Sequence, residues 1–258
     1  MTALPVTGEI TRDWAWGGAT GAGVDVAVID SGIDASHRFV GHVESAVALT
    51  YDSSLEDQVR KVEGPHGDLF GHGTACAGII RIAAPDCRLH SIRVLGERLT
   101  GKGVVFAAGL EWAIEHGFQV VNMSLSTGKE DYFSVFHELA DEAYFKGVML
   151  VCAVNNVAGA SYPSEYASVF SVAAHDAKDP FGFDYNPSPP AEFGAPGIDV
   201  EIAWSAGSTI VTTGNSFAAP HIAGLIARIL SKHPGLTPFQ MKTVLHAIAD
   251  NARGRDGG

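Results

Sequence analysis

The sequence predicts an α/β fold in three layers, with a mostly parallel central sheet covered by helices on both faces. Strand-like and helix-like segments alternate from residue 89 onward, which is typical of right-handed βαβ units. Residues 24–29 form a β-rich run that breaks at Asp30, as a buried parallel strand does at its carboxyl end. Two segments rich in small residues, 71–80 and 214–224, predict helices whose first turns can lie very close to the sheet.

The alternating segments follow one another without a repeat or a linker. Runs of apolar and β-branched residues predict strands at residues 89–95, 118–123, 148–154 and 169–174. Helical spacing predicts helices at 104–116, 132–145 and 216–230, and Thr237 caps a last helix that extends to residue 251. Residues 37–67 and 176–203 are irregular, and we expect surface segments there. We expect one domain over residues 1–258, of which residues 1–23 form an N-terminal arm.

Composition argues against several classes of partner. The chain has 258 residues with 46% apolar content, which suits a compact enzyme core. Its 17 Lys and Arg residues against 29 Asp and Glu give a net charge of −12, so a nucleic acid would be repelled. No apolar run is long enough to cross a bilayer, and residues 1–8 lack the features of a signal peptide. We therefore expect no membrane partner and a cytoplasmic location, although a secreted mature form stays open.

Ser216 is the candidate nucleophile. It lies in the segment Gly-Asn-Ser-Phe-Ala-Ala-Pro-His, residues 214–221, where a helix begins. A serine at that place is commonly only a helix cap. Nucleophilic catalysis also needs a base, a group that orients the base and donors for the oxyanion, and the N-terminus of a helix offers free N–H groups.

Asp30 and His72 are the candidate partners of that serine. Asp30 ends a buried strand, which is the edge of an α/β sheet where sites form, although an aspartate there can also cap a turn. His72 stands between two glycines at the start of a helix, so its backbone is free to approach a second element. A structural histidine is the alternative.

Taken together, these segments resemble the subtilases, the subtilisin-like serine proteases. The resemblance rests on three blocks in the same chain order, Val-Ala-Val-Ile-Asp-Ser-Gly-Ile-Asp at 26–34, His-Gly-Thr at 72–74 and the segment at 214–221. It implies a three-layer subtilisin-like fold and a triad in which Asp30 orients His72 and His72 activates Ser216. It also implies an oxyanion donor at Asn155, with the adjacent Asn156 as the alternative.

The resemblance extends to substrate-facing positions. Two edge segments would bind an extended peptide by strand addition, and the side chain before the scissile bond would enter a pocket between them. The implied residues are Leu99, Thr100, Gly101, Ser124, Leu125, Ser126, Cys152, Ala153 and Val154.

Several positions depart from the family pattern. Leu99, Ser126, Thr127 and Val154 replace common glycines, so we expect a narrower pocket that prefers small residues, with neutral repacking as the alternative. The helix from His72 lacks the insertion that supplies a tight calcium site in many members.

We therefore expect no metal or cofactor, although a weak calcium site among Asp176, Asp179 and Asp184 stays open. Phe217 stands where methionine is usual, which removes a site of peroxide damage. The thiol of Cys76, four residues after His72, is either near the base or a small core side chain.

These observations predict a serine endopeptidase that is an intracellular or selective processing protease. A maturation protease, macrocyclase or transpeptidase acting on one precursor is the alternative of the same chemistry, and an inactive binding module is the alternative of another class. The expected partners are a peptide or protein substrate and a propeptide or inhibitor.

Overall fold

The computed structural model describes residues 8–252, so residues 1–7 of the predicted arm and residues 253–258 lie outside it. Within this range nine strands form one sheet in the order β3-β2-β4-β1-β5-β6-β7-β9-β8. All neighbouring strands from β2 to β9 are parallel, and the edge strands β3 and β8 are antiparallel to their neighbours. The predicted fold class, a mostly parallel sheet between helices, is confirmed.

The strands are short, and the central ones are buried. The sheet contains β1 (Asp25–Asp30), β2 (Ser45–Tyr51), β3 (Val59–Glu63), β4 (Arg88–Arg93), β5 (Val120–Met123), β6 (Met149–Ala153), β7 (Phe170–His175), β8 (Asp184–Tyr185) and β9 (Phe193–Pro196). A separate antiparallel ribbon contains β10 (Val200–Ala203) and β11 (Thr209–Thr212). All residues of β5 and β6 are buried, as expected for strands covered on both faces.

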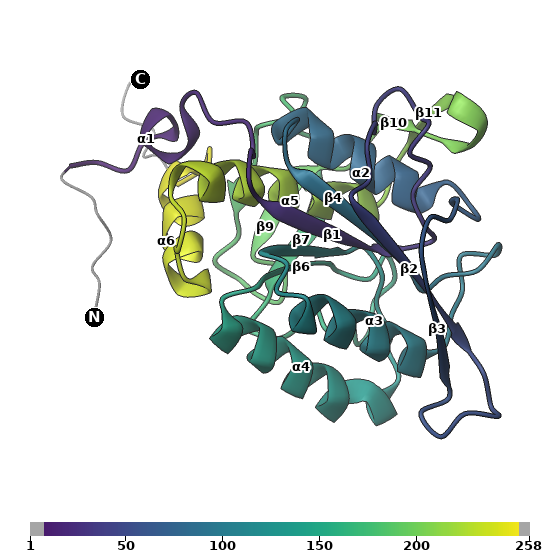
Figure 1. Cartoon of the computed structure of the whole chain (residues 1–258). Helices are drawn as coiled ribbons and strands as arrows, with labels where there is room; N and C mark the ends of the chain where they lie inside the picture. Colours follow the sequence, from purple (N-terminus) through teal and green to yellow (C-terminus); the bar gives the residue numbers. More distant parts are fainter. Residues whose placement is uncertain (1–7, 253–258) are drawn as a thin grey trace.

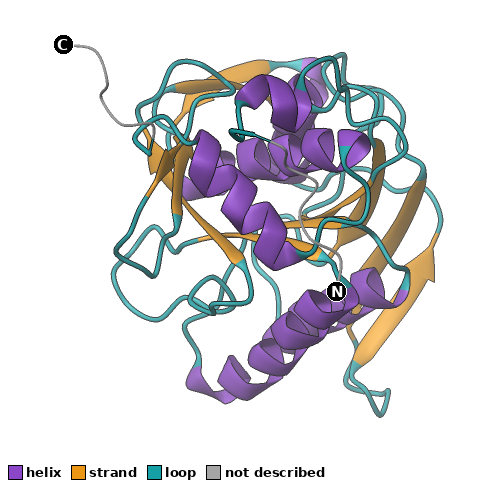
Figure 2. Cartoon of the chain, turned by 90° about the vertical axis from the view of Figure 1, so that its left-hand side faces the viewer, coloured by secondary structure: helices purple, strands orange, loops and turns teal. Residues whose placement is uncertain are grey.

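Helices cover both faces of the sheet (Figure 1). The long helices α2 (His72–Ala83) and α5 (Asn215–Lys232) lie on one face, whereas α3 (Gly103–Glu115) and α4 (Phe133–Lys146) lie on the other. The short α1 (Arg12–Trp16) and the C-terminal α6 (Pro238–Ile248) lie together at one end of the molecule (Figures 1 and 2). No helix in residues 8–252 has the length and apolar character required to cross a membrane.

The predicted elements agree with the structure to within a few residues, but the segments expected to be irregular contain further strands. Residues 37–67 include β2 and β3, and residues 176–203 include β8, β9 and β10. Strand β3 lies at the sheet edge and exposes four of its five residues, so its sequence (Val-Arg-Lys-Val-Glu) carries no buried run. Strand β8 has only two residues, too few for a periodic signal.

The topology places a site at the carboxyl end of β1. The chain runs from β1 out to β2, returns as β4 beside β1, and then crosses to β5 on the other side of β1.

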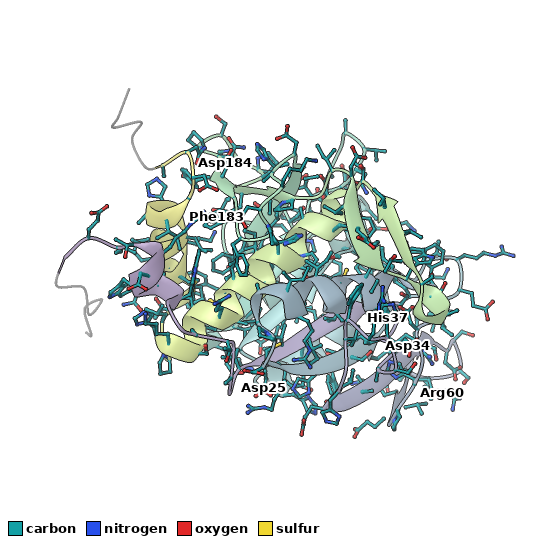
Figure 3. The ribbon with its side chains drawn as sticks, turned by 90° about the horizontal axis from the view of Figure 1, so that it is seen from above. Asp25, Asp34, His37, Arg60, Phe183 and Asp184 are labelled. Atoms are coloured by element: carbon teal, nitrogen blue, oxygen red, sulfur yellow. The ribbon has the colours of Figure 1, made fainter. Side chains whose placement is uncertain are left out.

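The loop after β1 carries Asp34 and His37, which lie near each other at one end of the molecule (Figure 3). His37 is buried, and its Nε2 lies 2.9 Å from Ser208 O of the β10-β11 connection, which ties this loop to the ribbon.

Candidate active site

Asp30 is the fully buried last residue of β1. Its Oδ1 accepts a hydrogen bond from its neighbour's backbone, Ser31 N, at 2.7 Å. Both carboxylate oxygens lie 2.9 Å from Nδ1 of His72. A buried carboxylate held in this way can fix which ring nitrogen carries the proton, leaving the other ring nitrogen free to act as a base.

His72 is the first residue of α2, and two close contacts bring it to the end of β1. A Cβ at Gly73 would lie only 2.1 Å from Gly32 O, so that approach requires a glycine. The Asp68 carboxylate accepts hydrogen bonds from Gly71 N and Thr74 N, both at 2.8 Å, and so caps the helix that carries His72. Sequence reasoning missed Asp68, although an aspartate shortly before a helix start is a recognisable capping signal.

The electrostatics of His72 favour a charged ring. Burial disfavours protonation, but the adjacent Asp30 carboxylate outweighs this effect and raises the pKa of His72 well above its usual value. The ring also lies against the aromatic ring of Phe217, with 5.2 Å between the centroids. The site therefore stabilises the imidazolium ion that a general base forms when it accepts a proton.

Ser216 lies in the first turn of α5, and its carbonyl has an unusual environment. In a regular helix that carbonyl would accept from the backbone N–H of residue 220, but Pro220 has none. Ser124 Oγ donates to Ser216 O at 2.8 Å instead, and Asn122 Nδ2 donates to Ser124 Oγ at 3.0 Å. A buried pair of side chains from the end of β5 thus holds the backbone of the candidate nucleophile.

Cys76 lies beside the candidate catalytic residues. Its Sγ lies 3.7 Å from Ser216 O and 4.0 Å from His72 Nδ1. The thiol is therefore near the base, as one reading of the sequence proposed, and it is also fully buried, as the other reading proposed. Burial raises the pKa of this thiol, so it stays protonated at neutral pH.

One cavity of about 230 Å³ brings the catalytic candidates together. His72 and Ser216 both line it, so residues of α2 and α5 contribute to the same cavity. Its other lining residues are Leu95, Leu99, Phe106, Ser124, Leu125, Ser126, Ala153, Val154, Asn155 and Asn156.

Asn155 and Asn156 both reach this cavity, but their side chains have different contacts. Asn156 Oδ1 accepts from the backbone N–H of Asn215, the residue before Ser216, at 3.0 Å. Asn155 Oδ1 instead accepts from Val157 N in its own loop at 3.3 Å. The contact to the start of α5 is thus made by the side chain of Asn156, not by that of Asn155.

The residues expected to bind substrate divide into three groups. Leu99, Ser124, Leu125, Ser126, Ala153 and Val154 line the cavity. Thr100 and Gly101 line a neighbouring cavity of about 440 Å³. Residues 99–101 do not form a strand, and they follow a turn that the bond from Leu99 N to Gly96 O closes. Cys152 is fully buried in the cluster beneath α3 and α4 and does not line the cavity, so the prediction that it walls the pocket is corrected.

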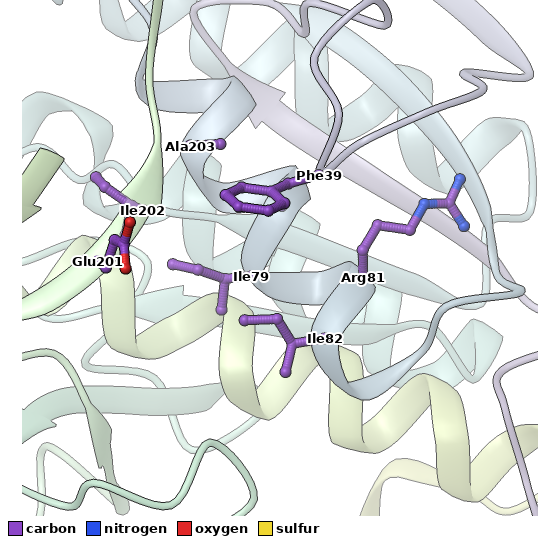
Figure 4. Close-up of a pocket in the computed structure, with 8 residues that line it drawn as sticks. Phe39, Ile79, Arg81, Ile82, Glu201, Ile202 and Ala203 are labelled. Atoms are coloured by element: carbon purple, nitrogen blue, oxygen red, sulfur yellow. The ribbon is translucent and has the colours of Figure 1, made fainter. Parts of the chain in front are cut away.

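Another apolar cavity, of about 300 Å³, lies between α2 and β10 (Figure 4). Phe39, Ile79 and Ile202 line it, and none of its lining residues is a serine, cysteine or histidine. The guanidinium of Arg81 points away from Phe39 and Ile79 (Figure 4) and donates to Val40 O at 2.9 Å. This cavity therefore lacks the hydroxyl, thiol and imidazole groups of a serine or cysteine peptidase site.

Asp30, His72 and Cys76 are the one group of three potential metal ligands whose donor atoms lie within 4.8 Å of each other in residues 8–252. Two of them form the hydrogen bond that orients His72, so a metal there would block the base. Each of the three aspartates considered for calcium contacts a protein group instead. Asp176 and Asp184 each face a different nitrogen of His175, and Asp179 accepts from Phe181 N.

The comparisons with known proteins agree with this geometry. A profile of the subtilase family matches residues 21–257. The chain belongs to the subtilase family. Subtilases are serine endopeptidases. The structure is also similar to a crystal structure of a cold adapted subtilisin-like serine proteinase, with a TM-score of 0.73 and 26% sequence identity, and the match covers 92% of this chain and 87% of that one.

Several named proteases are similar in sequence over most of this chain. Subtilisin DY of Bacillus licheniformis is 32% identical over 91% of this chain and 86% of its own length. Subtilisin E of Bacillus subtilis is 30% identical over 90% of this chain but only 62% of its own length. The thermostable alkaline protease of Halalkalibacterium halodurans is 30% identical over 90% of this chain and 63% of its own length.

Proposed function

We propose that this subtilase hydrolyses peptide bonds through an acyl-enzyme on Ser216. Ser216 Oγ would attack the scissile carbonyl while His72 Nε2 takes its proton and later gives it to the leaving amine. Asp30 would hold Nδ1–H and stabilise the imidazolium ion. The observation that carries this proposal is the buried Asp30–His72 pair, at 2.9 Å, in a cavity that Ser216 also lines.

We assign the side-chain oxyanion donor to Asn156 rather than Asn155. Because Asn156 Oδ1 is fixed by Asn215 N, its amide is held beside the start of α5, where the N–H of Ser216 is the second donor. The Asn155 side chain is bonded within its own loop and lacks that restraint. Removing such a donor costs about a hundred- to a thousandfold in kcat, so Asn156→Ala should show this loss and Asn155→Ala should not.

Recognition of an extended peptide would use residues 124–126. Their backbone N–H and C=O groups make no hydrogen bond to other backbone groups of residues 8–252, and Thr127 then pairs with Tyr162. A substrate strand can therefore add here. Leu99 also lines the cavity, and its backbone is left-handed, with a φ of 54°, a conformation that usually favours glycine.

The pocket walls favour a selective enzyme. Ser126 and Val154 both line the cavity, and each adds side-chain volume where glycine would leave space. We expect cleavage after small residues, measured as kcat/KM for matched peptides with Ala or Phe before the scissile bond. Val154→Gly should raise the rate for Phe relative to Ala, and equal parent rates for the two peptides would contradict the proposed narrow pocket.

The same experiment distinguishes hydrolysis from acyl transfer. Hydrolysis adds water to the products, whereas a transpeptidase or macrocyclase forms a new peptide bond, and product masses separate the two. Ser216→Ala should abolish both reactions. An intracellular processing role and control by a propeptide or inhibitor stay predictions, to be tested by locating the protein and its complexes in its own cells.

A further inference from the structure

Asn215 makes three hydrogen bonds to two different strand ends. Its backbone N–H donates to Asn156 Oδ1 at 3.0 Å. Its side-chain Nδ2 donates to Asn155 O at 3.1 Å, and its side-chain Oδ1 accepts from Ala174 N at 2.8 Å. Asn155 lies just after β6 and Ala174 lies in β7, so one side chain connects both strands to the first residue of α5.

These bonds fix the geometry on which oxyanion stabilisation depends. The two proposed donors, Ser216 N–H and Asn156 Nδ2, come from segments about 60 residues apart in sequence, a separation at which chain connectivity cannot set the distance between them. Asn215 is covalently joined to Ser216 and hydrogen bonded to both Asn155 and Asn156. Its contact with Ala174 anchors this arrangement to the sheet.

We propose that Asn215 is a positioning residue that sets the separation of the two oxyanion donors. It does not touch the substrate in this role but acts through Asn156, so the inference rests on the proposed function of Asn156. A donor acts on the oxyanion only within about 2.7–3.1 Å. Displacement of the Asn156 amide therefore reduces the stabilisation of the transition state more than it reduces the binding of the substrate.

The test is a double-mutant cycle of Asn215→Ala and Asn156→Ala, measured as kcat and KM on one peptide substrate. Asn215→Ala alone should lower kcat about tenfold, with KM changed less than twofold. In the Asn156→Ala background the same substitution should change kcat less than twofold, because the donor that it positions is gone. Affinity for a peptidyl boronic acid, which forms a tetrahedral adduct, should fall in parallel with kcat.

Asn251 provides a matched control for the loss of two side-chain hydrogen bonds. Its Nδ2 donates to Tyr185 O at 2.7 Å, and its Oδ1 accepts from Tyr185 N at 2.8 Å, at an exposed place near the C-terminal end of the described chain. Asn251→Ala should lower the melting temperature without lowering kcat. Asn215→Ser, whose short side chain cannot span both strand ends, guards against a folding failure specific to alanine and should also lose kcat.

The outcomes separate this inference from the proposed function. If Asn156→Ala leaves kcat unchanged, the assignment of Asn156 as an oxyanion donor fails. If Asn156→Ala lowers kcat but the Asn215 effect is absent, or is equally large in both backgrounds, only the positioning role of Asn215 is refuted. An equal loss of kcat in Asn251→Ala would also refute it, since destabilisation alone would then explain the effect.

Discussion

The buried imidazole of His221 should make the protein lose stability between pH 7 and pH 5. His221 lies in α5, only 4% exposed, with Nδ1 3.1 Å from Pro180 O. Burial lowers the pKa of His221 from 6.5 to about 4. The unfolded chain therefore binds a proton that the folded chain excludes, and the stability present above pH 6.5 is lost as the pH falls towards 4.

The size of this loss of stability follows from the thermodynamic linkage between proton binding and unfolding. A shift of one pKa unit corresponds to about 1.4 kcal/mol, so the depressed pKa of His221 predicts a loss of about 2 kcal/mol between pH 7 and pH 5 and about 3 kcal/mol by pH 4. His66 acts in the same direction, because burial lowers its pKa to about 4. His66 is half-buried, so solvent screening reduces its share.

The assay is urea unfolding at pH 7 and pH 5, in a Ser216→Ala background to prevent self-digestion. His221→Gln keeps a donor for Pro180 O but cannot titrate, so it should lose about 2 kcal/mol less than the parent on acidification. An equal pH dependence of the free energy of unfolding in the parent and His221→Gln would refute the reasoning.

Three further predictions concern the active site. The acid limb of the pH profile of kcat/KM should have its midpoint above pH 6.5, because the rate requires neutral His72 and Asp30 raises the pKa of that ring. In Asp30→Asn the midpoint should fall to lower pH, and kcat should be lower by about 10⁴-fold. An unchanged midpoint in Asp30→Asn would contradict the pairing of Asp30 with His72. Bulky thiol reagents should react slowly with buried Cys76 and inhibit when they do, and that inhibition should be absent in Cys76→Ala. The melting temperature should be nearly unaffected by EDTA, and a large fall would reveal a calcium site.

Much of the fold was predictable because its central elements carry strong local signals. Strand β1 is a nearly continuous buried run that stops at Asp30, and α2 begins where small residues follow His72. The candidate triad could be located for the same reason, since each proposed member lies at the end of a strand or the start of a helix. The edge strand β3 was missed because an exposed strand has no buried period to detect.

The finer details of the site depend on geometry that the sequence does not encode locally. All residues of β6 are buried, so no alternation indicates which face Cys152 occupies, and its assignment to the pocket was wrong. The choice between Asn155 and Asn156 depends on contacts with Asn215, which is 60 and 59 residues away along the chain. The role of Ser124 could not be predicted either. Ser124 donates to Ser216 O in place of the backbone N–H that Pro220 lacks.

The most direct test of the central claim is the intact mass of the protein after treatment with a serine-reactive fluorophosphonate. An activated Ser216 predicts one adduct on the parent, none on Ser216→Ala, and one on Ser231→Ala, which alters a serine in the last turn of the same helix. An adduct that persists in Ser216→Ala, or a folded parent that forms none, would contradict a triad of Asp30, His72 and Ser216.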